Sequence, residues 1–231
     1  IQKREQRTSE GREFMSLYGE SHRALHAQFD SERLAALLET MDAEEVQPQH
    51  KAFIESRDMF WVATVDKEGR PQCQYKGGAP GFIRVIDPKT VVFPSYDGNG
   101  RYHSMGNISA TGQVGLLFLD FESPNRLRLQ GTATVSADDP LLAEYKDAEL
   151  LVRINVTHVI INCPRYIHRM KRVEQSHTVP VAEKDTPFAQ WKRIDAVQEA
   201  LPAKDQGRAE GAGGVITMDQ WVENLMQGQG S

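Results

Sequence analysis

The most constraining feature of the sequence is a change of hydrophobic period at Met59. Before it, apolar residues recur every three to four positions, as on one face of a helix; after it, short runs of β-branched and aromatic residues alternate with polar ones. Turn signals separate these runs. The first is the stretch DKEGR, a hairpin turn in which Gly69 can adopt a positive φ. We predict strands at 59–65, 71–77, 81–86, 90–95, 113–121, 126–136 and 154–167.

Six or seven short strands joined by hairpins favour one architecture. A closed or partly closed antiparallel barrel removes the exposed edges that an open sheet of this kind would leave. We therefore expect a mainly β (α+β) fold, a six- to seven-stranded antiparallel split β-barrel with helical extensions at both ends. Helical connectors are expected at 101–110 and 139–148.

The flanking regions are predicted to be helical. Residues 12–46 fit two helical pieces, the second capped by Asp30 or Ser31, and 50–57 fit one or two further turns. At the other end, 187–200 fit an amphipathic helix that begins at Pro187, 202–214 a polar glycine-rich linker, and 218–226 a short helix capped by Thr217. Its apolar face would cover either a partner subunit or the barrel of the same chain. The terminal GQGS is expected to be frayed. The expected division is a helical extension (1–50), the barrel domain (51–170) and a helical extension with a tail (171–231).

Composition limits the classes of function. A net charge of −5 over 231 residues, with 39% apolar and 26% charged residues, describes a globular chain and argues against a nucleic-acid partner. Two cysteines are too few for a disulfide framework, and His22 and His26 have no further ligand at metal-binding spacing. No apolar run is long enough for a membrane span and no signal core precedes residue 10, so a cytoplasmic protein without metal or membrane partner is expected.

Chemistry concentrates in the segment YDGNGRYHSMGNI, residues 96–108. Gly98 and Gly100 allow several backbone N–H groups to converge, a helix beginning near Arg101 would direct its N-terminal dipole to the same point, and Arg101 adds a fork of donors. A phosphate site and a plain turn both fit this pattern. Gln72, Gln74 and Lys76 share one face of their strand, as do Arg126 and Arg128 of theirs; each face is either solvent-exposed or lines a polar site.

At these residues the sequence resembles the pyridoxamine 5′-phosphate oxidase-like family of FMN-binding split-barrel proteins. The resemblance covers roughly 50–170 and follows the order of FIESRDMFWVAT, GRPQCQYKGG, GFIRVID, VVFPSYDGNGRYHSMGNI, VGLLFLDF and LRLQGTA. It implies a homodimer with FMN at the subunit interface and a small-molecule substrate. It further implies these cofactor-binding residues: Gln74, Tyr75 and Lys76 beside the flavin, Pro94 and Ser95 near its ring edge, Asn99, Arg101 and Ser104 at the phosphate, with Arg128 and Asn107 as further contacts.

The resemblance implies an FMN-dependent oxidoreductase, in which the flavin carries the redox chemistry and no catalytic side chain stands out. The C-terminal ending that closes the vitamin site in true oxidases has no counterpart in this sequence, so pyridoxamine phosphate is not the expected substrate. Two alternatives remain open. One is a flavin- or haem-binding module for storage or sensing, with His103 or His168 as haem ligand; the other is a reductase that uses a deazaflavin.

Overall fold

The seven predicted strands are present, and they surround a core built on phenylalanines. The computed structural model describes residues 16–228. Phe60 is fully buried, and its ring lies 5.1–5.6 Å from those of Phe82, Phe93 and Phe118. The strands are β1 (Met59–Val65), β2 (Pro71–Gly77), β3 (Arg84–Asp87), β4 (Thr90–Tyr96), β5 (Gln113–Asp120), β6 (Asn125–Ser136) and β7 (Ala148–Asn162). Alternation along β1 and β5 turns Phe60 and Phe118 into the barrel, Phe93 lies in the continuously buried β4, and Phe82 packs from the bend before β3; their apolar surface is removed from water.

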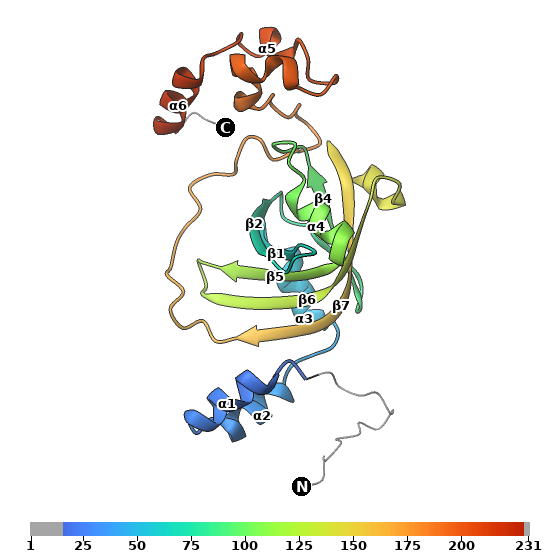
Figure 1. The fold of residues 1–231 in the computed structure, drawn as a ribbon, viewed down its shortest axis with the longest axis vertical. Coiled ribbons are helices and arrows are strands. Elements are labelled where there is room, and N and C mark those ends of the chain that lie inside the picture. The colour runs from blue at the N-terminus through green and yellow to red at the C-terminus, as the bar shows by residue number, and fades with distance from the viewer. Residues whose placement is uncertain (1–15, 229–231) are drawn as a thin grey trace.

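The strands form one antiparallel sheet in the order β2-β1-β5-β6-β7-β4-β3. The two edge strands, β2 and β3, are not paired with each other, so the barrel is split; this confirms the predicted fold. The first hairpin turns at Gly69, whose φ of 80° is the left-handed conformation expected there. The barrel occupies the middle of the molecule in Figure 1, with helices below and above it.

The helices before the barrel follow the predicted pattern with shifted ends. They are α1 (Glu20–Gln28), α2 (Glu32–Glu39) and α3 (Pro48–Glu55). Asp30, with φ of 49°, separates the first two, and Pro48 occupies the first turn of α3, where its missing N–H costs nothing. The predicted apolar face of α2 is present, but only Ala35 is buried. The predicted helical residues 12–15 lie outside the described part of the chain.

One connector and the bounds of two strands differ clearly from the prediction, and the first of these strands, β3, begins at Arg84 rather than at residue 81. Residues 139–148 contain only a 3₁₀ helix, η1 (Pro140–Glu144), and β7 begins at Ala148 rather than at residue 154. The segment AELLVRI has the composition of a helix, but its backbone pairs with β4 on one side and β6 on the other. Tertiary pairing therefore overrides the local preference. At its far end β7 stops at Asn162, before Pro164.

The C-terminal region differs most from expectation. The predicted helix 187–200 is instead two 3₁₀ helices, η2 (Gln190–Arg193) and η3 (Asp195–Ala200), because Ile194 between them is extended and forms a bridge to Ile216. The predicted linker, residues 202–214, contains α5 (Arg208–Gly211) and the buried residues Asp205 and Ala209. The last helix, α6 (Met218–Met226), is confirmed, with Thr217 Oγ1 accepting from the N–H of Gln220 (3.2 Å).

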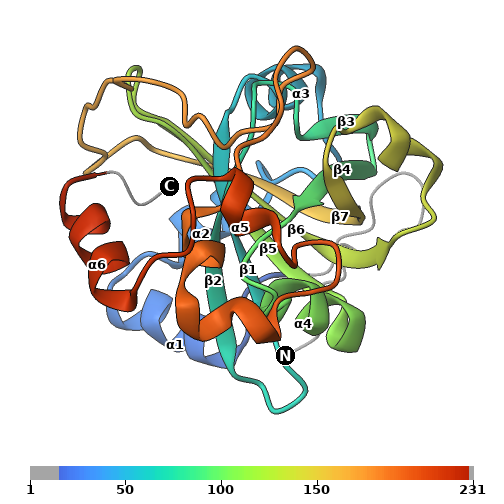
Figure 2. The same ribbon diagram turned by 90° about the horizontal axis from the view of Figure 1, so that it is seen from above.

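We call residues 188–228 the C-terminal unit. An extended segment leads to it from the end of β7, along the outside of the barrel to the opposite end of the molecule (Figure 1). From above, the unit lies over the end of the barrel near α4 (His103–Thr111), the helix between β4 and β5 (Figure 2). Between residues 16 and 228, none of the helices combines the length and apolarity needed to cross a bilayer.

Candidate functional site

A polar pocket lies where β2, the end of β4 and the start of α4 meet. It has a volume of about 100 Å³, and five of the predicted cofactor-binding residues line it: Gln74, Lys76, Ser95, Asn99 and Ser104. The other lining residues are Tyr96, Gly98, Gly100, Tyr102, His103 and Met105. The glycine-rich segment and the polar face of β2 were predicted separately, and the fold brings them together.

The start of α4 supplies backbone donors to this pocket. Tyr102 caps the helix in the left-handed conformation, with φ of 48°, and its carbonyl accepts from the N–H of Gly106 at 2.7 Å. The N–H groups of His103, Ser104 and Met105 precede that bond and have no partner within the helix. Together with the helix dipole they favour an anion at this end of α4.

The side chains around the helix start are held in place by hydrogen bonds. Ser104 Oγ donates to Gln74 Oε1 at 2.6 Å, and Gln72 Nε2 lies 2.7 Å from His103 Nδ1. One turn later, Asn107 Nδ2 donates to Thr64 Oγ1 at 3.0 Å. These contacts fix α4 against β1 and β2, so the donors at its start keep a defined position.

Lys76 is the cation of the pocket. Its side chain is half-buried, and within residues 16–228 it has no hydrogen-bond or ion-pair partner. Removal from water lowers the pKa of its amine. An anion in the pocket would provide the charge partner that the fold does not supply.

Tyr96 lines the pocket and also packs against the hydrophobic core. Burial, together with nearby Tyr145 and Asp147, raises the pKa of the Tyr96 phenol to about 12. Its hydroxyl is therefore protonated at neutral pH.

The remaining predicted residues do not line the pocket. Pro94 is buried in β4. Arg101 is exposed in the loop after β4, where its backbone N–H donates to Asn99 Oδ1 at 3.2 Å. Asn107 serves the contact with Thr64. Tyr75 and Arg128 project from the other face of the sheet. Residues paired across neighbouring strands share a face, and Tyr75 pairs with Trp61, Trp61 with Leu117, and Leu117 with Arg128. There Arg128 Nε donates to Asn162 Oδ1 at 2.8 Å.

Tyr75 lines a second, larger groove of about 650 Å³ between the outer face of the barrel and residues 170–179. Two of its arginines already have carboxylate partners: Arg57 lies 3.0 Å from Asp120, and Arg172 pairs with Asp58. The groove lining also holds Lys171, but its four carboxylates, Asp58, Asp120, Glu122 and Glu174, outnumber its three cations, whereas the pocket at α4 is lined by Lys76 and by no carboxylate. The two predicted haem-ligand candidates lie apart. His103 lines the pocket at α4, whereas His168 is exposed and lines neither the pocket nor the groove.

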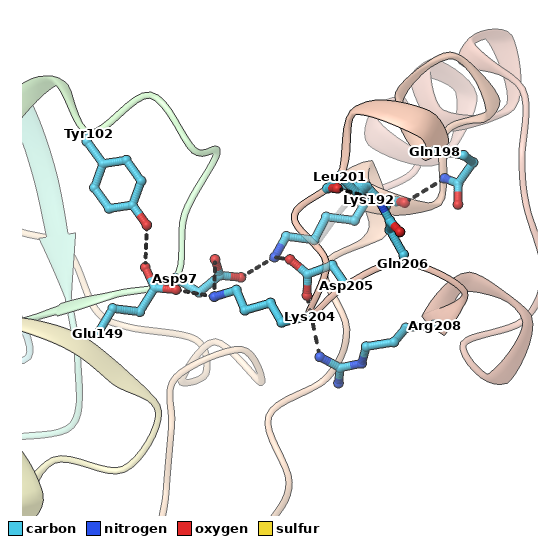
Figure 3. Close-up of polar contacts among 10 residues, drawn as sticks. All are labelled: Asp97, Tyr102, Glu149, Lys192, Gln198, Leu201, Lys204, Asp205, Gln206 and Arg208. Carbon is cyan, nitrogen blue, oxygen red and sulfur yellow. Dashed lines mark hydrogen bonds and ion pairs between the residues drawn. The ribbon is translucent and has the colours of Figure 1, made fainter.

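Sequence reasoning missed one set of residues next to the pocket. Asp97, which follows β4, pairs with Lys192 and Lys204 of the C-terminal unit, and Tyr102 donates to Glu149 at 2.8 Å (Figure 3). The lysines come from a region predicted as helix and linker. No motif marks them, because their carboxylate partners lie far away in the chain.

Solved structures similar to this chain are distant from it in sequence. They include HupZ of Group A Streptococcus (20% identity, TM-score 0.41, covering 54% of this chain and 99% of that one). A second is the heme storage protein HutZ of Vibrio cholerae, with 18% identity and a TM-score of 0.38, covering 50% of this chain and 94% of that one. A third is an FMN-binding protein of Syntrophomonas wolfei, with 11% identity and a TM-score of 0.36, covering 60% of this chain and 97% of that one. Curated protein sequences give no match.

The family comparison covers the barrel. The model of the pyridoxamine 5′-phosphate oxidase family matches residues 46–170, more than half of the chain and all seven strands up to the end of β7. The match includes the polar strand β2, the glycine-rich loop and α4, which together form the pocket. The chain therefore belongs to the pyridoxamine 5′-phosphate oxidase family.

Proposed function

We propose that this chain is an FMN-binding flavoprotein that holds the phosphate of the cofactor in the pocket at the start of α4, and that it acts as an FMN-dependent oxidoreductase on a small molecule. One observation carries the proposal: Lys76 is a half-buried amine without a partner in the described residues, next to backbone donors of a helix start. A dianionic phosphate matches both.

The residues of the pocket have distinct tasks in this proposal. Lys76 and the N–H groups of His103, Ser104 and Met105 would hold the phosphate, while the bond from Ser104 to Gln74 keeps the helix start in position. When bound, the flavin supplies the hydride or electron transfer.

The size of the pocket supports a dimeric site. At about 100 Å³ it is smaller than the roughly 300–1,000 Å³ of complete pockets for organic ligands, so one subunit would hold the phosphate and not the whole flavin. We infer a homodimer in which a second subunit completes the site. The outer residues Tyr75 and Arg128 could then contact a flavin bound through the partner. We also propose that the chain is divided into a helical extension (1–50), the barrel domain (51–170) and a helical extension with a tail (171–231).

The first experiment is an absorbance spectrum of the purified protein, followed by titration of the cofactor-free protein with FMN. Flavin bands with FMN released on heating would support the proposal. A colourless protein that does not bind added FMN would refute it. A Soret band would favour the haem-binding alternative instead.

Lys76→Met tests the site assignment. Loss of a charge-assisted bond in a partly buried pocket should weaken FMN binding by about 1.5–3 kcal/mol, or roughly 10- to 150-fold in Kd. Lys67→Met is the matched control, because it removes the same charge from the exposed turn between β1 and β2. Equal affinities of the two variants in a protein that binds FMN would contradict the assignment.

A further inference from the structure

An ion-pair cluster with a buried centre joins the C-terminal unit to the loop that lines the pocket (Figure 3). Its centre is Lys192 on η2, whose side chain is 3% exposed. The Lys192 amine pairs with the carboxylate of Asp97 and lies 2.7 Å from Asp205 Oδ2. An ammonium so far from water is stable only where carboxylates face it. The contact with Asp97 is therefore a structural link between the unit and the end of β4.

A second lysine links the unit to the other end of the loop. Lys204 pairs with Glu149 on β7 and lies 3.7 Å from Asp97 Oδ1. Glu149 Oε2 in turn accepts from the Tyr102 hydroxyl at 2.8 Å. Asp97 and Tyr102 enclose the loop 98–101, so both ends of the loop that contributes Gly98, Asn99 and Gly100 to the pocket are held through Lys192 and Lys204.

The cluster also balances charge beside an anion site. Asp97, Glu149 and Asp205 face Lys192, Lys204 and Arg208, so three carboxylates meet three cations. Burial alone would raise the pKa of the Glu149 carboxyl, but hydrogen bonds from Lys204 and Tyr102 outweigh it and hold that pKa below its ordinary value. Without the lysines, the negative charges of Asp97 and Glu149 would repel a phosphate in the adjoining pocket.

We propose that the C-terminal unit is a working part of the anion pocket, fixing the loop Asp97–Tyr102 and neutralising the carboxylates behind it, so that binding of a phosphorylated ligand depends on Lys192 and Lys204. Both lysines lie beyond the family-matched residues 46–170. For the identity of its ligand this inference rests on the proposed function. Lys192 and Lys204 act through Asp97 and Glu149, and are therefore positioning residues.

Lys204→Met is the test variant, because this side chain is 53% exposed and its removal leaves the buried pair of Lys192 and Asp205 intact. FMN and riboflavin, which lacks the phosphate, are titrated against the cofactor-free variant. We expect FMN to bind about tenfold more weakly than to the unaltered protein, and riboflavin to change by less than about twofold. Lys67→Met serves as the control of equal charge.

The double variant Lys204→Met/Glu149→Gln separates charge from an unspecific loss of structure. The amide introduced by Glu149→Gln would still accept from the Tyr102 hydroxyl but carries no charge, so most of the FMN affinity should return. Where the unaltered protein binds FMN, an FMN affinity of Lys204→Met equal to that of Lys67→Met would overturn the proposal. An equal loss for both flavins, or no recovery in the double variant, would overturn it too.

Failure of the proposed function itself would be recognised separately, as an unaltered protein that binds no FMN. Amide hydrogen exchange of the ligand-free protein then decides the structural role of the unit. Faster exchange of residues 97–102 in Lys204→Met than in Lys67→Met would support the link between the unit and the loop. Equal exchange in the two variants would overturn it.

Discussion

At the scale of single residues, the pocket depends on a lysine that the fold leaves without a partner among residues 16–228. The sequence of β2 alone predicts that Gln74 and Lys76 share a face, because successive side chains of a strand point to opposite faces. It does not predict that this face meets α4, which depends on the hydrogen bond from Ser104 to Gln74 across 30 positions of the chain. The role of Lys192 was beyond sequence reasoning altogether, since its partner Asp97 lies 95 positions away.

The pH dependence of FMN binding should reveal Lys76. Desolvation lowers the pKa of its amine, so the charged form that attracts phosphate is lost at a lower pH than for an exposed lysine. FMN affinity should therefore fall as the pH rises through that lowered pKa. In Lys76→Arg the guanidinium stays charged over the same range, and the fall should be much smaller.

The measurement is the Kd for FMN from about pH 7 to about pH 9.5 in both proteins, a range below the ordinary pKa of an exposed lysine. Using the same ligand in the same buffers removes any titration of the flavin from the comparison. Parallel curves for the two proteins would show that Lys76 does not hold the anion.

At the scale of elements, the strands with strict alternation were the easiest to predict. The bounds of β1 and β2 match the sequence pattern, and β4, β5 and β6 differ by a residue at one end. The β7 strand was placed six residues too late because its first half lacks alternation and is buried through pairing on both sides. The C-terminal 3₁₀ helices escaped prediction for a related reason, since the bridge of Ile194 to Ile216 is a contact between distant segments.

A glycine at the irregularity between β6 and β7 gives a stability prediction at this scale. The register shifts between Gln130 and Gly131, and a Cβ atom on Gly131 would lie 2.3 Å from the Asn155 carbonyl oxygen. Gly131→Ala should lower the free energy of unfolding by about 1–3 kcal/mol or more, because the backbone of β7 must move. Urea denaturation measures this change.

Gly115→Ala on β5 is the matched control. Its added Cβ would meet only the Ala63 Cβ, at 4.0 Å, so its unfolding free energy should stay within about 0.5 kcal/mol of the original. Equal stability of the two variants would mean that the strands at Gly131 are not packed as described.

At the scale of the whole molecule, several large apolar side chains of the N-terminal helices are exposed in the single chain. Leu37 on α2 is 59% exposed and Phe29 beside α1 is 71% exposed. The other exposed apolar side chains of this region are Leu25, Leu34, Leu38 and Met41. Apolar surface of this kind commonly marks a contact with another chain.

The proposed homodimer predicts a solution mass of twice the 26.0 kDa of the chain. Sedimentation equilibrium at micromolar concentration, with and without FMN, measures it. A monomeric mass in a sample that retains FMN would contradict a site completed by a second subunit.

The strand order also determines when the barrel can form during synthesis. The β4 strand pairs with β3 and with β7, which ends at Asn162, and β1 pairs with β2 and with β5. A nascent chain that has emerged only as far as residue 100 can therefore form two separate hairpins, whose apolar faces have no partners. These hairpins need protection from aggregation until the later strands leave the ribosome. The pocket at α4 forms only when β7 brings the two hairpins together.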